Sequence, residues 1–368
     1  MAETPLARLI REIIVTDGPV SVARFMDLCL GHPSHGYYMT RDPFGVSGDF
    51  TTAPEISQMF GELLGLWVAG LWQQMGCPEQ VALVELGPGR GTLMADALRA
   101  ARALPPFRAA LACHLVEMSP VLQQAQHQRL AGSGVPTQWH RSIDRLPDDR
   151  PLIVIANEFF DALPVHQFVR QGGAWHERQI GLDAAGRFCF GLAGAAADVR
   201  LPDGQESDVR ELCPQGATIV DALGRRLAAQ GGALLAIDYG YARPAAGDTV
   251  QALRRHRSED MLARPGEADL TAHVDFSALA AAGRRAGLLS WPLLTQGALL
   301  IRLGLGERAA ALAASAPGRA DEIEAACQRL AGPDAMGHLF KALCLTAPGM
   351  PAPPAFDSAD LAVAPLEA

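Results

Sequence analysis

Residues 81–92 constrain this chain most, because they combine a short apolar run, a glycine-rich turn and the start of a helical pattern. The apolar run, 81–86, is β-branched at two positions and ends at glycine, which favours a buried parallel strand. Gly87, Gly89 and Gly91 follow, and the lack of a Cβ there allows a tight turn and lets a ligand approach main-chain N–H groups. The stretch therefore predicts an α/β protein that binds a nucleotide-like ligand.

The residues of this turn favour one class of ligand over others. A phosphate-binding P-loop needs Lys followed by Ser or Thr after the last glycine, whereas this chain has Gly91 and Thr92 after Arg90. A dinucleotide fingerprint needs Gly or Ala where Thr92 stands, so it matches only in part. Glu85, two residues before the first glycine, completes E-x-G-x-G-x-G, which resembles the first motif of class I S-adenosylmethionine-dependent methyltransferases. A carboxylate beside the turn favours a ligand with the positive charge of a sulfonium amino acid over a negatively charged pyrophosphate. The alternative is a turn with only a structural role.

Composition argues against several other classes of protein. The chain has 368 residues and a net charge of −9, and Lys341 is its only lysine, so nucleic-acid binding has little support. Its seven cysteines are scattered and lack a C-x-x-C pair, which indicates neither a disulfide framework nor a metal site. No run approaches the roughly 18 apolar residues of a membrane span, and the N-terminus lacks a signal-peptide core. We expect a soluble cytoplasmic protein without metal, nucleic-acid or membrane partners.

An acid ends the next predicted strand, residues 111–117. Glu117 lies about one strand–helix unit beyond the glycines, where many nucleotide-binding α/β proteins place an acid on the ribose hydroxyls. A carboxylate there can accept two hydroxyl hydrogen bonds at once. The alternative is a solvated strand end.

Polar residues also follow the predicted strand 152–156. Ligands of open α/β sheets lie outside the carboxyl ends of the strands, so we expect Asn157, Glu158 and Asp161 near the glycine turn. Two carboxylates suit a cationic acceptor such as arginine, whose planar fork matches paired oxygens. The alternative is that Asp161 caps a helix and Glu158 faces solvent.

Five ordered motifs make the resemblance specific. Together they look like the MidA family of S-adenosylmethionine-dependent methyltransferases, and the match covers most of residues 5–345; the motifs are residues 48–61, 85–91, 157–164, 237–240 and 269–276. The resemblance implies an α/β class I methyltransferase fold, with a Rossmann-like, mostly parallel seven-stranded sheet, an N-terminal helical segment and β and helical insertions. Mitochondrial members assist complex I assembly and dimethylate an arginine of one of its subunits. The implied cofactor is S-adenosyl-L-methionine.

The candidate site combines these motifs. The resemblance implies that Asp49, Thr51 and Thr52 line the cofactor pocket. The alternative is that they only form a turn and a helix cap. The expected cofactor-binding residues are Asp49, Thr51, Thr52, Glu85, Gly87, Gly89, Gly91 and Glu117. The expected catalytic residues are Asn157, Glu158, Asp161 and His273. In this hypothesis Glu158 and Asp161 orient a guanidinium for direct methyl transfer and Asn157 holds the cofactor or acceptor backbone, while His273 is a candidate base by residue type alone.

The organisation of the chain follows from the same pattern. We expect an N-terminal helical and loop cover at 1–76, a core at 77–305 with insertions at 165–215 and 241–274, C-terminal helices and a strand at 306–347, and a disordered tail at 348–368. The pattern of the first insertion predicts an antiparallel meander. Residues 288–294 and 298–303 are predicted to form the final pair of core strands. A protein substrate is the expected partner and a homodimer a candidate assembly. A small-molecule methyltransferase and a cofactor-binding assembly factor without turnover remain alternatives.

Overall fold

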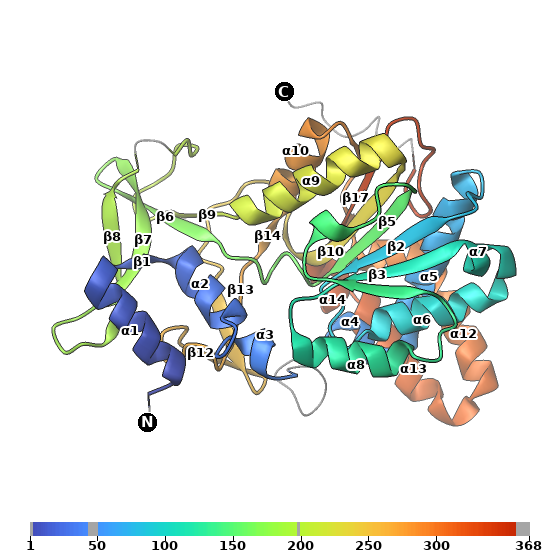
Figure 1. The fold of residues 1–368 in the computed structure, drawn as a ribbon, viewed down its shortest axis with the longest axis horizontal. Coiled ribbons are helices and arrows are strands. Elements are labelled where there is room, and N and C mark those ends of the chain that lie inside the picture. Colours follow the sequence, from blue (N-terminus) through green and yellow to red (C-terminus); the bar gives the residue numbers. More distant parts are fainter. Residues whose placement is uncertain (1–2, 43–50, 197–198, 358–368) are drawn as a thin grey trace. The chain divides into compact units, whose positions relative to one another are not determined.

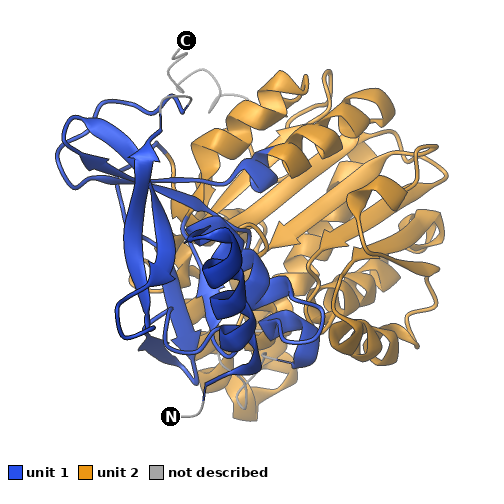
Figure 2. Cartoon of the chain, turned by 60° about the vertical axis from the view of Figure 1, so that its left-hand side comes forward, with its two compact units in different colours: residues 1–50, 161–217, 243–273 blue, residues 51–160, 218–242, 274–368 orange. Residues whose placement is uncertain are grey.

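The computed structural model describes residues 3–42, 51–196 and 199–357, and the chain forms two compact units (Figure 2). Unit 1 comprises residues 1–50, 161–217 and 243–273, and unit 2 comprises residues 51–160, 218–242 and 274–368. The segments of unit 1 after residue 160 nearly coincide with the two predicted insertions, whereas residues 51–76 belong with the glycine turn. The predicted division of the chain into 1–76, 77–305 and 306–347 stays a prediction.

Unit 2 is built on one sheet with the order β15-β17-β10-β5-β2-β3-β4 (Figure 1). The neighbours from β10 to β4 are parallel, and β17 is antiparallel to β10. Within the described ranges the sheet has nine strands rather than the predicted seven, because β14 pairs with the end of β10 and β16 pairs with β17 over two residues each. The strands are β2 (Val81–Leu86), β3 (Leu111–Val116), β4 (Thr137–His140), β5 (Leu152–Asn157), β10 (Gly232–Tyr241), β14 (Val274–Asp275), β15 (Leu289–Ser290), β16 (Leu294–Thr295) and β17 (Phe340–Thr346).

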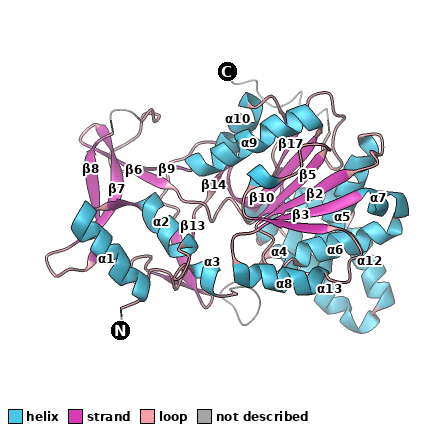
Figure 3. Ribbon diagram, viewed as in Figure 1, coloured by secondary structure: helices cyan, strands magenta, loops and turns pink. Residues whose placement is uncertain are grey.

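Helices lie along both faces of this sheet (Figure 3). The helices that contribute to unit 2 are α4 (Ala53–Ile56), α5 (Gln58–Gln74), α6 (Thr92–Ala100), α7 (Pro105–Ala110), α8 (Pro120–Leu130), α9 (Pro214–Gln230), α10 (Phe276–Arg285), α11 (Gln296–Arg302), α12 (Leu305–Ser315), α13 (Ala320–Ala331) and α14 (Met336–Leu339). The predicted apolar face of α5 is buried, with Trp67 and Leu64 at 0 % exposure, in one core with side chains from β2, β3, β5 and β10. Alternation along the strands places every second residue in this core.

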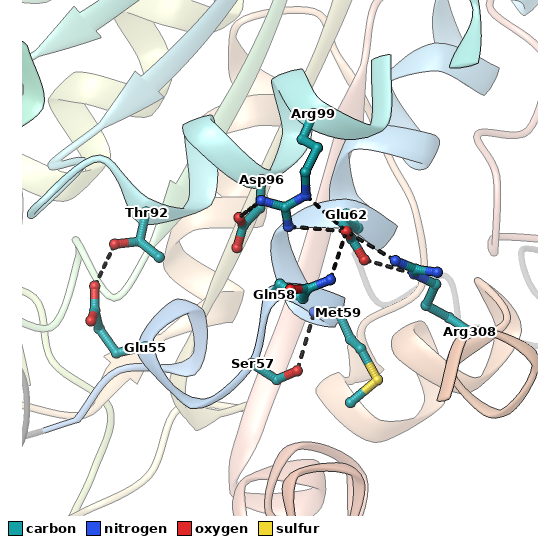
Figure 4. Close-up of polar contacts among 9 residues, drawn as sticks. All are labelled: Glu55, Ser57, Gln58, Met59, Glu62, Thr92, Asp96, Arg99 and Arg308. Carbon is teal, nitrogen blue, oxygen red and sulfur yellow. Dashed lines mark hydrogen bonds and ion pairs between the residues drawn. The ribbon is translucent and has the colours of Figure 1, made fainter. Parts of the chain in front are cut away.

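A buried carboxylate, Glu62 of α5, ties three helices of unit 2 together (Figure 4). It accepts hydrogen bonds from Arg99 Nη2 of α6 at 3.0 Å and from Arg308 Nε of α12 at 2.7 Å. Asp96 pairs with the same Arg99 at 2.7 Å. Because a buried carboxylate needs such partners, the network fixes α6, the helix that begins after the glycine turn, against α5.

Unit 1 has its own core of side chains, which include Ile10, Phe25, Ile180 and Leu270. Its five-stranded sheet has the order β1-β7-β6-β9 with β8 paired to β7, and a three-stranded sheet has the order β12-β11-β13. The antiparallel pairs β6–β7 and β7–β8 confirm the predicted meander. The elements are α1 (Pro5–Asp17), α2 (Val22–Gly31), α3 (Tyr37–Thr40), β1 (Val20–Ser21), β6 (His166–Gln171), β7 (Ala174–Leu182), β8 (Phe188–Ala195), β9 (Val209–Leu212), β11 (Gln251–Arg254), β12 (Arg257–Glu259) and β13 (Asp269–Thr271).

Two predictions about the C-terminal third are wrong. Of residues 298–303, predicted as a strand, 298–302 belong to α11 and Leu303 is its C-cap; Thr295 Oγ1 caps the first turn by accepting from the Ala298 N–H at 3.2 Å. Residues 348–357 of the predicted disordered tail are packed, because Phe356 is buried and the Ala352 carbonyl accepts a hydrogen bond from Gln74. Residues 358–368 lie outside the described residues.

The close approach of α5 to α6 generates a prediction about stability. A Cβ at Gly65 would lie 2.8 Å from the Cα and the carbonyl oxygen of Ala97, and backbone atoms cannot move aside easily. We expect Gly65→Ala to lower the free energy of unfolding in urea by about 1–3 kcal/mol. The control is Gly306→Ala in α12, where a Cβ meets nothing within 4 Å, and it should leave stability unchanged or raise it by up to about 1 kcal/mol. Equal effects of the two substitutions would contradict this account of the packing.

Candidate functional site

The register of β2 with its two neighbours assembles one polar edge of the sheet in unit 2. Leu86 at the end of β2 pairs with Val116 of β3 and with Ala156 of β5, so the glycine turn, Glu117 and Asn157 all follow adjacent strand ends. Glu85, Glu117 and Asn157 are buried, with 3 %, 8 % and 8 % of their surface exposed. These three residues therefore lie at the same edge of the sheet, while their roles in a site stay predictions.

The glycine turn has the left-handed backbone that its composition suggests. The φ angles of Gly87, Gly89 and Gly91 are +58°, +53° and +76°, a region that side chains with a Cβ rarely adopt. A Cβ at Gly87 would lie 3.0 Å from the Phe159 ring. The turn then leads into α6 at Thr92, so the free N–H groups of a helix start lie directly after the glycines.

Glu85 is a buried acid whose surroundings suit a cationic group. Among the described residues its Oε2 atom has no hydrogen-bond partner. Burial, and then the charge of Glu117, raise the pKa of the Glu85 carboxyl to about 8. A buried carboxylate without a partner is costly, and a cationic ligand group would relieve that cost.

Glu117 is held from two sides. Its Oε1 atom accepts from the Ser119 N–H at 2.8 Å, and its Oε2 atom accepts from Gln126 Nε2 at 3.2 Å. Burial raises the pKa of this carboxyl, and the hydrogen bonds from Ser119, Gln126 and the Met118 backbone lower it in part. Sequence reasoning missed Gln126, although its position between Leu122 and Leu130 on the buried face of α8 marks a polar residue in an apolar stripe.

The end of β5 carries a strained acid beside an amide. Glu158 has a φ of +49°, which costs a residue with a Cβ on the order of 1–3 kcal/mol. Its Oε1 atom accepts from Asn157 Nδ2 at 3.2 Å and from the Ala53 N–H at 3.1 Å. Asp238 stabilises this turn, since its Oδ2 atom accepts from the Phe160 N–H at 3.0 Å. The Oδ1 atom of Asn157 is buried and has no partner in the part of unit 2 that the structure describes.

The N-terminal candidates are only partly within the described residues. Thr52 is buried and precedes α4, while Thr51 is half-buried and Asp49 lies outside the described residues. Helix α4 is tied to the glycine turn by a hydrogen bond from Thr92 Oγ1 to the Glu55 carboxylate (Figure 4). Together with the bond from Ala53 to Glu158, this places Thr52 beside the polar edge of the sheet.

Asp161 and His273 belong to unit 1 and are brought near one another there. The Asp161 carbonyl accepts from the Ala272 N–H at 2.9 Å, and the His273 N–H donates to Thr249 Oγ1 at 2.9 Å. Burial, Asp269 and Asp161 raise the pKa of Tyr38, so a second acidic cluster lies in this unit. Asn157 and Glu158 therefore lie together in unit 2, and Asp161 lies with the segment of His273 in unit 1. A joint site of all four residues stays a prediction.

Comparison with known proteins agrees with this architecture. A mostly parallel α/β sheet with an acid near the end of β2, a glycine turn after it and an acid directly after β3 is typical of the class I methyltransferase fold. A family model of S-adenosyl-L-methionine-dependent methyltransferases matches residues 63–292, and the chain belongs to this family. A Burkholderia thailandensis protein solved with S-adenosyl-homocysteine bound superposes with a TM-score of 0.85 at 28 % identity, covering 98 % of this chain and 99 % of that one.

Curated relatives extend over most of the chain. The zebrafish (Danio rerio) protein arginine methyltransferase NDUFAF7, mitochondrial, is 37 % identical over 91 % of this chain and 85 % of its own length. The mouse (Mus musculus) protein of the same name is 36 % identical over 92 % of this chain and 83 % of its own. The predicted cytoplasmic location is therefore wrong, because these relatives are mitochondrial proteins. No helix within the described ranges has the length and apolar character to cross a membrane.

The raised pKa of Glu85 generates a prediction about stability and pH. Because the folded protein binds this proton more tightly than the unfolded chain, the contribution to stability is complete below about pH 4.5 and is lost as the pH rises through about 8. We expect Glu85→Gln, which stays neutral, to stabilise the ligand-free protein relative to wild type by up to about 5 kcal/mol more at alkaline than at acidic pH.

The measurement is urea unfolding at about pH 5 and about pH 8.5, which lie on either side of the pH at which the buried Glu85 loses its proton. Glu79→Gln serves as the control, since it removes an exposed carboxylate shortly before the same strand. If Glu85→Gln changed stability equally at both pH values, the buried acid would not be protonated in the folded protein.

Proposed function

We propose that this chain transfers a methyl group from S-adenosyl-L-methionine to an arginine side chain of a protein partner. The observation that carries the acceptor class is the end of β5, where a strained Glu158 and Asn157 lie beside the glycine turn. The names of the relatives, which are protein arginine methyltransferases at 36–37 % identity, support the same class. The resemblance to the MidA family suggests a complex I subunit as the partner.

The described residues fit the cofactor in three respects. Glu85 would face its ammonium group, because its Oε2 atom is buried and has no partner among the described residues. Glu117 would accept the ribose hydroxyls, since it is a buried carboxylate at the end of β3 whose donors Ser119, Gln126 and Met118 leave part of its lone-pair capacity. The glycine turn, which lacks Cβ atoms, would let the cofactor approach the backbone. When bound, the cofactor supplies a methyl group on a positively charged sulfur.

The acceptor residues then have mainly to position the substrate. The methyl group passes from sulfur to a guanidinium nitrogen, and that nitrogen loses one proton. Glu158 would orient the planar guanidinium through paired hydrogen bonds, and Asp161 would stabilise its charge. Asn157 would hold the cofactor or the acceptor backbone, and His273 is the candidate for receiving the proton. Alignment of this kind is worth about 7–11 kcal/mol when both reacting groups are well held.

Cofactor binding can be tested without turnover. We expect wild type to bind S-adenosyl-homocysteine in calorimetry and Gly89→Val to lose this binding, because a branched side chain is strained at φ +53° and fills the turn. The control is Gly172→Val, which has a similar φ of +59° in an open hairpin turn of unit 1. Loss of binding in both variants, or in neither, would argue against a cofactor at this turn.

Methyl transfer tests the acceptor. We expect radiolabel from S-adenosyl-L-methionine to appear in methylated arginine after acid hydrolysis of labelled lysate protein. Glu158→Gln and Asp161→Asn should each lower the transfer rate by tenfold or more, on the order of a lost charge-assisted hydrogen bond, and should leave S-adenosyl-homocysteine binding largely intact. Asp17→Asn at the exposed end of α1 is the control. Label on lysine or on a small molecule, with none on arginine, would exclude the proposed acceptor.

A further inference from the structure

Gln126 is a fully buried amide on the otherwise apolar face of α8. Its exposure is 0 %, and the other buried residues of this helix are Leu122 and Leu130. Burying an amide without hydrogen bonds costs free energy, so a glutamine at such a position needs partners for both ends of its side chain. The residues that supply these partners belong to the candidate cofactor site.

The chemistry of the partners determines how this amide is oriented. Trp139 Nε1 can only donate, and it lies 3.0 Å from Gln126 Oε1. The Gly89 carbonyl oxygen can only accept, and it lies 2.7 Å from Gln126 Nε2. The same Nε2 atom donates to Glu117 Oε2 at 3.2 Å. A flipped amide would oppose donor to donor and acceptor to acceptor, so Trp139 holds the NH₂ group toward the glycine turn and Glu117.

This arrangement sets what Glu117 can still bind. An ionised carboxylate offers about four lone-pair positions, two on each oxygen. The Ser119 N–H occupies one position on Oε1, and Gln126 Nε2 occupies one on Oε2. The Met118 backbone N–H also hydrogen-bonds this carboxylate. These donors fix the plane of the carboxylate and leave part of its lone-pair capacity for ligand hydroxyl groups.

We infer that Gln126 is a positioning residue for the cofactor, which orients Glu117 toward the two ribose hydroxyls and links it to the Gly89 carbonyl of the glycine turn. The inference rests on the proposed assignment of Glu117 to the ribose. It adds that the preference for a ribose over a deoxyribose depends on a side chain that does not itself contact the ligand. Trp139 takes part as the residue that fixes the amide.

Calorimetry with two ligands tests this inference. The ligands are S-adenosyl-homocysteine and its 2′-deoxy counterpart. We expect Gln126→Met, which keeps the volume and loses the donor, to weaken binding of S-adenosyl-homocysteine about tenfold and to reduce the preference for the ribose form severalfold. Gln124→Met on the exposed side of the same helix is the matched control and should change neither value.

Two further variants separate positioning from simple packing. Trp139→Phe keeps a ring but removes the N–H that orients the amide, so it should reduce the same preference by a smaller factor. In the double variant Glu117→Gln with Gln126→Met, the second substitution should add little to the first, because both act through one carboxylate. Weaker binding in Gln126→Met with an unchanged ribose preference would overturn the inference and leave Gln126 a structural residue. Wild type that binds both ligands equally would overturn it as well, but would leave the proposed methyl transfer standing.

Discussion

The parallel register of β2 with β3 and β5 is the constraint on which the rest of the site depends. Because Leu86 pairs with both Val116 and Ala156, the chain leaves three adjacent strands at one level, and the polar residues that follow meet there. A shift of one residue would turn Glu85 to the opposite face of the sheet and exchange the apolar side chains that pack on its two faces. The buried interior of β2 therefore fixes the position of its functional end.

Two buried glutamates in unit 2 illustrate how a site differs from a scaffold. Glu62 and Glu85 are 5 % and 3 % exposed. Glu62 is satisfied by Arg99 and Arg308, so its charge joins helices and contributes to the fold. Glu85 has a carboxylate oxygen without a partner among the described residues. Its raised pKa favours the neutral, protonated form of the side chain. The second arrangement lowers stability, and the proposed cofactor would offset this cost.

The sequence allowed more to be predicted near the glycine turn than far from it. Glycine spacing and helix caps are local signals, and they correctly predicted the turn between β2 and α6 and the starts of α1 and α8. The apolar run 298–303 is too short for the spacing of its apolar residues to distinguish a strand from a helix. In the structure the N-cap at Thr295 begins a helix there. The role of Gln126 depends on partners 13 and 37 residues away, and the pairing of Ala272 with Asp161 spans an even longer stretch of chain.

The division of the candidate residues between the units suggests how this chain departs from a minimal methyltransferase. Every described candidate for cofactor binding lies in unit 2, on or beside the sheet of that unit. Asp161 and His273 lie in unit 1, whose later segments nearly coincide with the predicted insertions. Since function resides in sites added to a common fold, the acceptor is expected to depend on these insertions more than on the sheet. On the proposed function, the glycine turn would bind the donor of the methyl group, and the residues around Asp161 would contribute to the choice of acceptor.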